Sequence, residues 1–189
     1  MAIPVVRLAK SLRYALKDMQ GIKYSDYELV ESINQAASLL YSRLSERYVY
    51  ASLKKTVLIV GSNEEANLPS DFVRLHQLVT SSNDGECIPI STLPVVEGTY
   101  RIIGDTIYAK PGAYSLEYYY VPSRVKGLGD NLDVPLSMSP YIEQISLALF
   151  GNNLQLAEQI ILQCSQSLAL TEVSHFRDVG PTQILGGKI

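Results

Sequence analysis

The chain has 189 residues, of which 47% are apolar and 19% charged, and its net charge is −3. This length allows one domain with a sizeable core, and the apolar content excludes a disordered chain. No segment concentrates basic charge and no apolar run reaches the roughly 18 residues of a membrane helix, so neither tight phosphate binding nor a membrane span is expected. The N-terminus lacks the continuous apolar core of a signal peptide, which predicts a soluble protein of intracellular origin.

Two helices are predicted in the N-terminal part of the chain. Residues 4–19 start with Pro4 in a first-turn position and repeat apolar residues on one face. Residues 25–47 start with Ser25 and Glu28, the two positions of a capping box, and carry a long apolar stripe. Both helices therefore need a surface on which to bury their apolar faces.

The pattern of residues 55–122 changes to the two-residue period of strands. We expect a small antiparallel β unit of about five or six strands, because turn signals separate short β-branched and aromatic runs. A first hairpin has its polar tip at residues 81–86, and a second turns at Gly104-Asp105. Pro89 marks an edge strand or a bulge, since proline cannot donate to a sheet.

Two more helices and a tail complete the chain. Residues 139–150 start with Ser139-Pro140, an N-cap followed by a first-turn proline, and residues 153–173 form the last helix. From residue 174 the helical pattern is lost, because three glycines and a proline disfavour a helix. We expect residues 174–189 to be disordered in the free subunit, although they include the large apolar residues Phe176, Ile184, Leu185 and Ile189.

This order of elements predicts an α+β fold that is mainly α. The helices from both ends of the sequence would form a four-helix bundle, with the small antiparallel β unit inserted in its middle. Residues 1–173 would be a single domain and residues 174–189 an extended C-terminal arm. Cys87 and Cys164 are expected to be buried free thiols, because they do not indicate a disulfide framework.

No catalytic, cofactor-binding or metal-binding residues are predicted. His76 and His175 have no His, Cys or carboxylate nearby at a metal-ligand spacing. Cys87 could meet His76 across the first hairpin, but chance proximity explains that pair better than a nucleophile and its base. The acidic loop around Asp130 and Asp133 does not have the spacing of a calcium loop.

Tyrosine is unusually abundant, with 13 residues against three phenylalanines and no tryptophan. Tyr118, Tyr119 and Tyr120 would place rings on both faces of one strand. One interpretation puts the core on one side and a half-exposed rim on the other. The alternative makes these residues a candidate subunit interface, because tyrosine combines a large contact area with a polar group.

The ordered set of segments resembles the head-to-tail adaptor (connector) proteins of tailed bacteriophages. The similar segments are the helix YSDYELVESINQAASLLYSRLSERY, the Leu-Pro-x-Asp-Phe entry into a strand in NLPSDFVRLHQLV, the strand LEYYYVPSRV and the helix pair that starts at Ser139. Together they cover about residues 6–172.

The resemblance implies a structural virion protein without enzymatic activity, made in the host cytoplasm and located at the head–tail junction. Such adaptors form a homo-oligomeric ring, commonly a dodecamer, that extends the DNA channel below the portal protein and docks tail or nozzle proteins. Genomic DNA would pass through without specific binding. The arm residues named above would bind the portal, and the first hairpin tip would contact a neighbour or a tail protein through Asn83, Asp84 and Gly85.

Isolated subunits are expected to be monomeric or weakly associated and to form the ring on the portal, which raises their effective concentration. Two alternatives remain open. The first is another virion component, such as a tail-tube or head-completion protein. The second is a small phage-encoded lysis or DNA-processing hydrolase.

Overall fold

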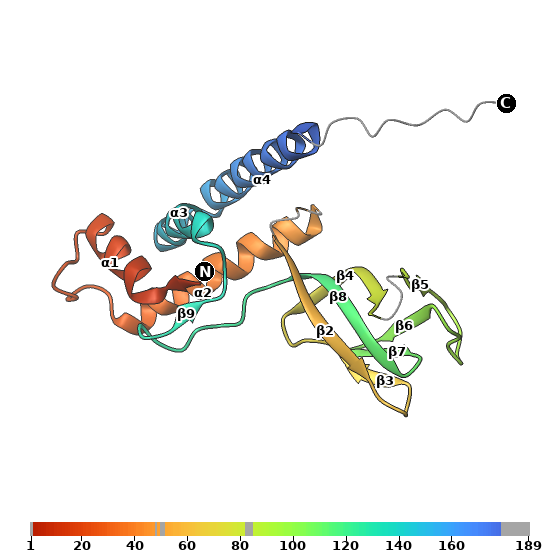
Figure 1. Ribbon diagram of the computed structural model, residues 1–189. Helices are drawn as coiled ribbons and strands as arrows, with labels where there is room; N and C mark the ends of the chain where they lie inside the picture. Colours follow the sequence, from red (N-terminus) through yellow and green to blue (C-terminus); the bar gives the residue numbers. More distant parts are fainter. Residues whose placement is uncertain (1, 48, 50–51, 82–84, 179–189) are drawn as a thin grey trace.

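The structure is a computed structural model that describes residues 2–47, 49, 52–81 and 85–178, with side chains described up to residue 168. The molecule is elongated, with α1 of the helical part at one end and the β unit at the other (Figure 1). The helices are α1 (Val5–Ala15), α2 (Asp26–Glu46), α3 (Ser139–Phe150) and α4 (Leu154–Asp178), and a short 3-10 turn, Leu136–Met138, precedes α3.

The strands form three sheets within the described residues. Strand β1 (Ile3–Pro4) pairs with β9 (Asn131–Leu132) beside the helices. In the β unit, a three-stranded sheet has the order β2-β8-β4 and a four-stranded sheet the order β3-β7-β6-β5. The bounds of its strands are β2 Leu53–Val60, β3 Glu65–Asn67, β4 Phe72–Thr80, β5 Ile88–Pro89, β6 Thr99–Ile103, β7 Thr106–Ala109 and β8 Gly112–Tyr120.

The prediction of a mainly α fold built as a four-helix bundle is wrong. The structure is 39% helical and 28% strand, with three sheets of two to four strands, and is therefore a mixed fold of helices and sheets. The physical reason is that the β unit buries residues of both of its sheets, among them Leu58, Leu78, Ile107 and Leu116. Helix α1 is also shorter than expected: it ends at Ala15, four residues early, and Lys17 takes a φ of 55°, outside the right-handed helical region.

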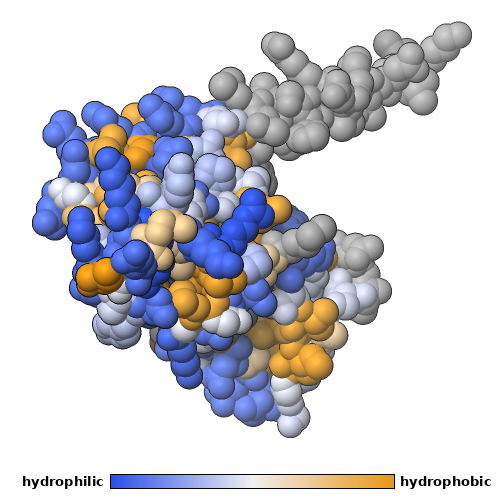
Figure 2. Space-filling view, turned by 90° about the vertical axis from the view of Figure 1, so that its left-hand side faces the viewer, coloured by the Kyte–Doolittle hydropathy of each residue, from blue (hydrophilic) through white to orange (hydrophobic). Residues whose placement is uncertain are grey.

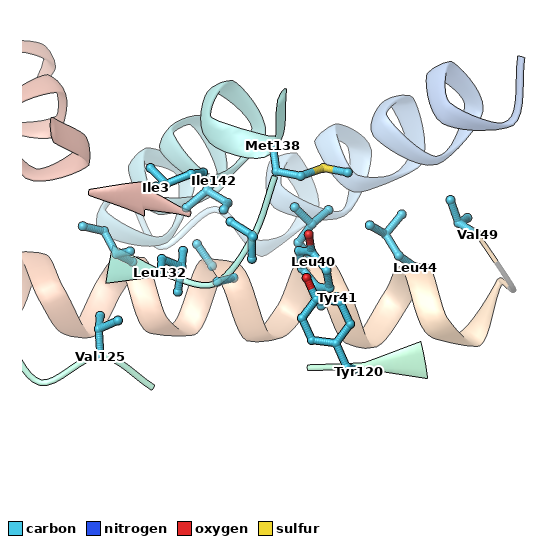
Figure 3. Packing of buried hydrophobic residues seen from close by; sticks show 14 of the residues in the cluster. Ile3, Leu40, Tyr41, Leu44, Val49, Tyr120, Val125, Leu132, Met138 and Ile142 are labelled. Carbon is cyan, nitrogen blue, oxygen red and sulfur yellow. The ribbon is translucent and has the colours of Figure 1, made fainter. Parts of the chain in front are cut away.

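Helix α2 is the centre of the helical part, because it packs against α1, α3 and α4. Its start is the predicted capping box: the Glu28 backbone N–H donates to Ser25 Oγ, and the Ser25 backbone N–H donates to the Glu28 carboxylate at 2.7 Å. Figure 3 shows Leu40, Tyr41 and Leu44 pointing from α2 into the buried cluster. The amphipathic stripe therefore determines how the other helices are placed.

A buried amide fixes the segment that follows β8 onto α2. The Asn34 side chain donates to the backbone oxygen of Val125 and accepts from its backbone N–H, each at 2.9 Å. These two bonds give a partner to the backbone N–H and oxygen of Val125 and to the amide oxygen and nitrogen of Asn34, which would otherwise be buried without one. The chain thus returns from the β unit along α2 before it reaches β9 and α3.

Several local predictions are confirmed. The turn at Gly104-Asp105 connects β6 and β7, and Gly104 takes the positive φ of 59° that such a turn requires. Pro89 lies in β5, at the edge of its sheet, as expected for a residue that cannot donate to a neighbouring strand. Cys87 and Cys164 are both buried free thiols.

Candidate interaction surfaces

The three tyrosines proposed as a subunit interface are buried inside the subunit. Tyr118, Tyr119 and Tyr120 are 1%, 2% and 5% exposed, so neither face of this part of β8 is available to a neighbour. The reason is that β8 is the central strand of its sheet and that its last residues also lie against α2, where the Tyr120 ring contacts the Tyr41 ring. The interpretation as an interface is therefore not supported by these residues.

The first predicted hairpin is short in the structure. Strand β4 pairs with β8, and only its last residues contact the returning chain, through the bridge between Val79 and Glu86. After that bridge, β5 leaves to pair in parallel with β6. The Thr80 N–H donates to the Gly85 oxygen at 2.9 Å, whereas Asn83 and Asp84 lie outside the described residues. The contact predicted for this tip stays a prediction, but its flanking strands do not form a free arm.

The predicted arm begins later than residue 174. Helix α4 continues to Asp178, five residues beyond the end expected from the sequence at position 173, so the backbone of Phe176 is helical. Ile184, Leu185 and Ile189 lie outside the described residues. Their assignment to portal binding stays a prediction.

Among the residues that the structure describes, no three or more His, Cys, Asp or Glu side chains gather in a way that could hold a metal ion. None of the helices in that part of the chain is long and apolar enough to cross a membrane.

An ionic cluster, here called the junction, joins the β unit to the segment that leads back to α3. The Lys54 amine on β2 lies 2.8 Å from an oxygen of Asp71, before β4, and 2.8 Å from an oxygen of Asp133, after β9. The Tyr118 hydroxyl donates to the other Asp71 oxygen at 2.9 Å, and the Lys54 amine lies 5.1 Å from the centre of the Tyr120 ring. The junction therefore fixes the β unit relative to the helical part.

The charges of the junction support one another. Burial disfavours the Lys54 ammonium, but hydrogen bonds to Asp133 and Asp71 outweigh this cost, and the pKa of Lys54 is raised. Burial, together with the hydrogen bond to Asp71, raises the pKa of Tyr118, which keeps its hydroxyl protonated as a donor. The cation, the two carboxylates and the Tyr118 hydroxyl of the junction are therefore paired with one another.

A second polar centre organises the segment between α1 and α2. The Asp18 side chain accepts hydrogen bonds from the backbone N–H groups of Ile22, Lys23 and Tyr24 at 2.9–3.0 Å, and from Arg13 at 3.1 Å. The bond from Lys23 contributes most to lowering the Asp18 pKa, against the opposing effect of burial. One carboxylate thus holds the segment in a single conformation.

The same segment requires a glycine. Gly21 has a φ of 66°, and a Cβ at this position would lie 3.0 Å from Nη1 of Arg13. Arg13 also donates to the backbone oxygen of Tyr24 and to the Asp26 carboxylate. The guanidinium therefore connects α1, the segment and the start of α2 into one rigid unit.

Residues 2–24, here called the basic lobe, present apolar and basic side chains on this rigid support. Tyr14, Met19 and Ile22 are between 66% and 79% exposed and line a hollow of about 760 Å³ together with Lys17 and Lys23. Figure 2 views the molecule from the side of the basic lobe and shows hydrophobic patches among hydrophilic side chains. Exposed apolar clusters of this kind are typical of interaction sites.

The basic lobe corrects the expectation that no segment concentrates basic charge. Residues 2–24 contain five Lys or Arg residues against one Asp, although the whole chain has 16 against 19 Asp and Glu. The remaining residues therefore have 11 basic against 18 acidic side chains. Charge counted in short windows would have revealed this asymmetry, which the net charge of the chain conceals.

A second exposed surface lies at one edge of the β2-β8-β4 sheet. Strand β2 pairs with β8 in regular register along its whole length and exposes Val57 and Ile59 to solvent. The other edge strand, β4, has two register shifts, and such bulges protect an edge from pairing with further strands. The edge at β2 lacks this protection.

Comparison with known protein families and with curated proteins finds no match to this chain.

Proposed function

We propose that this chain is a structural adaptor that assembles in several copies at a head–tail junction of a tailed bacteriophage. The observation that carries the proposal is the order of its elements: a helix pair, a β unit in which Leu68-Pro69 precede strand β4, a return along α2 and a second helix pair. This order corresponds to the segments on which the resemblance to adaptor proteins rests. The apolar surface of the basic lobe and the exposed edge of β2 support a role in protein contacts.

In this proposal the helical part and the β unit would have separate partners. The junction holds them at a fixed orientation, so a load on one part would be transmitted to the other through rigid contacts. The C-terminal arm would bind the portal through Ile184 and Leu185, and the copies would gain affinity from ring symmetry because each arm is weak alone.

Electron microscopy of this chain mixed with a portal protein of the same phage tests the proposal. We expect additional ring-shaped density below the portal, and its loss when residues 178–189 are deleted. The melting temperature of the deleted chain should stay nearly unchanged, which separates loss of binding from loss of folding. Portal rings that remain bare at excess protein would refute the adaptor role, and long tubes formed without portal would favour a tail-tube protein.

A further inference from the structure

The β unit ends in an exposed apolar surface of opposite charge to the basic lobe. This surface, here called the acidic end, consists of residues 85–105, which contain three acidic residues and one basic residue. Its charged side chains are Glu86, Glu97, Asp105 and Arg101. Its large apolar side chains, each between 45% and 65% exposed, are Ile88, Leu93, Val96 and Ile103.

Two of the carboxylates of the acidic end are neighbours. The Ile88 N–H donates to the Gly98 oxygen at 2.9 Å, which brings the segments that carry Glu86 and Glu97 together. Both carboxylates add to the effect of burial in raising the pKa of the Cys87 thiol between them. Neither carboxylate forms an ion pair within the described part of the chain. Their charge is therefore available to a basic partner.

The basic lobe and the acidic end lie at opposite ends of the elongated molecule (Figure 1). We propose that the basic lobe of one copy docks on the acidic end of a second copy, with Lys17 and Lys23 facing Glu86 and Glu97. Because the two surfaces differ, the contact is heterologous and repeats from copy to copy, which produces a ring when the rotation closes. Only the closure of the contacts into a ring rests on the proposed function; the contact between two copies does not.

The apolar content of both surfaces favours a second copy over nucleic acid as the occupant of the basic lobe. The hollow is lined by Tyr14, Met19 and Ile22 as well as by two lysines. An apolar side chain flanked by carboxylates, such as Val96 beside Glu97, satisfies both kinds of lining residue. A phosphate backbone would satisfy the lysines alone and leave the apolar side chains uncovered.

Disulfide trapping tests the contact directly. Ile22 and Val96 are 79% and 59% exposed, so a chain with Ile22→Cys and Val96→Cys should form a ladder of dimers, trimers and larger species on oxidation. Each single variant can form dimers at most. The matched control combines Val96→Cys with Leu154→Cys, which is 64% exposed at the start of α4 and belongs to neither surface, and it should give no ladder. The native cysteines are buried and should not interfere.

Charge reversal in the same cysteine background tests the recognition. Lys17→Glu with Lys23→Glu should reduce the ladder at least tenfold, and so should Glu86→Lys with Glu97→Lys. The chain with all four reversals should recover the ladder to within about twofold, because complementarity is restored. Lys126→Glu, an exposed change of the same sign elsewhere, should have no effect.

The proposal is overturned if no ladder forms. It is also overturned if the chain with all four charge reversals forms no more ladder than the chains with two. Binding of a 30-base-pair DNA duplex that depends on Lys17 and Lys23, without a ladder, would assign the lobe to nucleic acid instead. Portal decoration in the same samples separates the two proposals. Rings on the portal without a ladder refute this contact alone, whereas a ladder without portal decoration refutes the adaptor role alone.

Discussion

The polar centres around Asp18 and Lys54 use the same chemistry in different surroundings. Asp18 is 4% exposed and holds three backbone N–H groups and a guanidinium, all from residues close in sequence. Lys54 is partly exposed and joins two carboxylates that are 17 and 79 residues away in the chain. Asp18, whose partners are close in sequence, therefore shapes one surface of the molecule. Lys54, whose partners are far apart in sequence, sets the orientation of the β unit relative to the helical part.

The largest expected effect is that of Asp18→Ala. The substitution leaves three backbone N–H groups and the Arg13 guanidinium without their acceptor, and unsatisfied buried donors are costly. We expect the melting temperature to fall by about 5–10 °C and the basic lobe to become accessible to proteases. Calorimetry and limited proteolysis measure both.

Asp26→Ala provides the control for Asp18, because it removes the other carboxylate on Arg13 from a mostly exposed position. It should change the melting temperature by no more than about 2 °C. If both substitutions have the same effect, the backbone hydrogen bonds of Asp18 do not organise the lobe.

The stabilisation by Asp18 should depend on pH with a definite sign. Its pKa is lower in the folded chain than its ordinary value of 3.8, so its contribution is fully present above about pH 4 and is lost as the pH falls through the folded pKa. The stability difference between the wild-type chain and Asp18→Asn should therefore be largest at pH 5–7 and shrink below pH 4. Urea denaturation of both chains across pH 2.5–7 tests this, and a difference that grows on acidification contradicts it.

A smaller effect is expected at the junction. Lys54→Met removes the cation between Asp71 and Asp133 but leaves Tyr118 as a donor to Asp71. We expect a loss of about 1–2 kcal/mol in the free energy of unfolding. Lys55→Met is the matched control, because its pair with Glu117 is on the surface and should be worth about 0–1 kcal/mol. Equal losses in urea titrations of the two variants would show that the junction is no more than a surface ion pair.

The local elements and the basic charge of residues 2–24 can be predicted from the sequence, but the shapes of the basic lobe and of the acidic end cannot. The capping box of Ser25 and Glu28 and the turn at Gly104 depend on residues within a few positions, so their patterns were sufficient. The end of α1 was missed because Asp18 acts on backbone groups four to six residues later, which no helix pattern reveals.

Burial was hardest to predict where a segment lies against a distant one. The tyrosines of β8 have an amphipathic composition that suits an interface, and only the positions of α2 and β4 show that they are enclosed. The acidic end was missed for a related reason. Glu86 and Glu97 are eleven positions apart and become neighbours only because β5 pairs with β6 in parallel.

The smallest expected effect concerns Tyr41, which lies next to the junction. Figure 3 shows its side chain beside Tyr120, yet no hydrogen bond of normal geometry joins the two hydroxyls. The Tyr120 hydroxyl donates to the Asp133 backbone oxygen at 3.1 Å, whereas the Tyr41 hydroxyl is buried without a partner among the described residues. Burial raises the pKa of Tyr41 well above its usual range.

Tyr41→Phe should therefore leave the free energy of unfolding unchanged or raise it by up to about 1 kcal/mol, because it removes an unsatisfied polar group and keeps the ring. Tyr120→Phe should lower the free energy by about 1 kcal/mol, because it removes a hydrogen bond and leaves the Asp133 oxygen without it. Urea titrations of the two variants give opposite signs if the hydroxyls differ as described. A loss in Tyr41→Phe as large as that in Tyr120→Phe would mean that Tyr41 has a polar partner in solution and belongs to the junction.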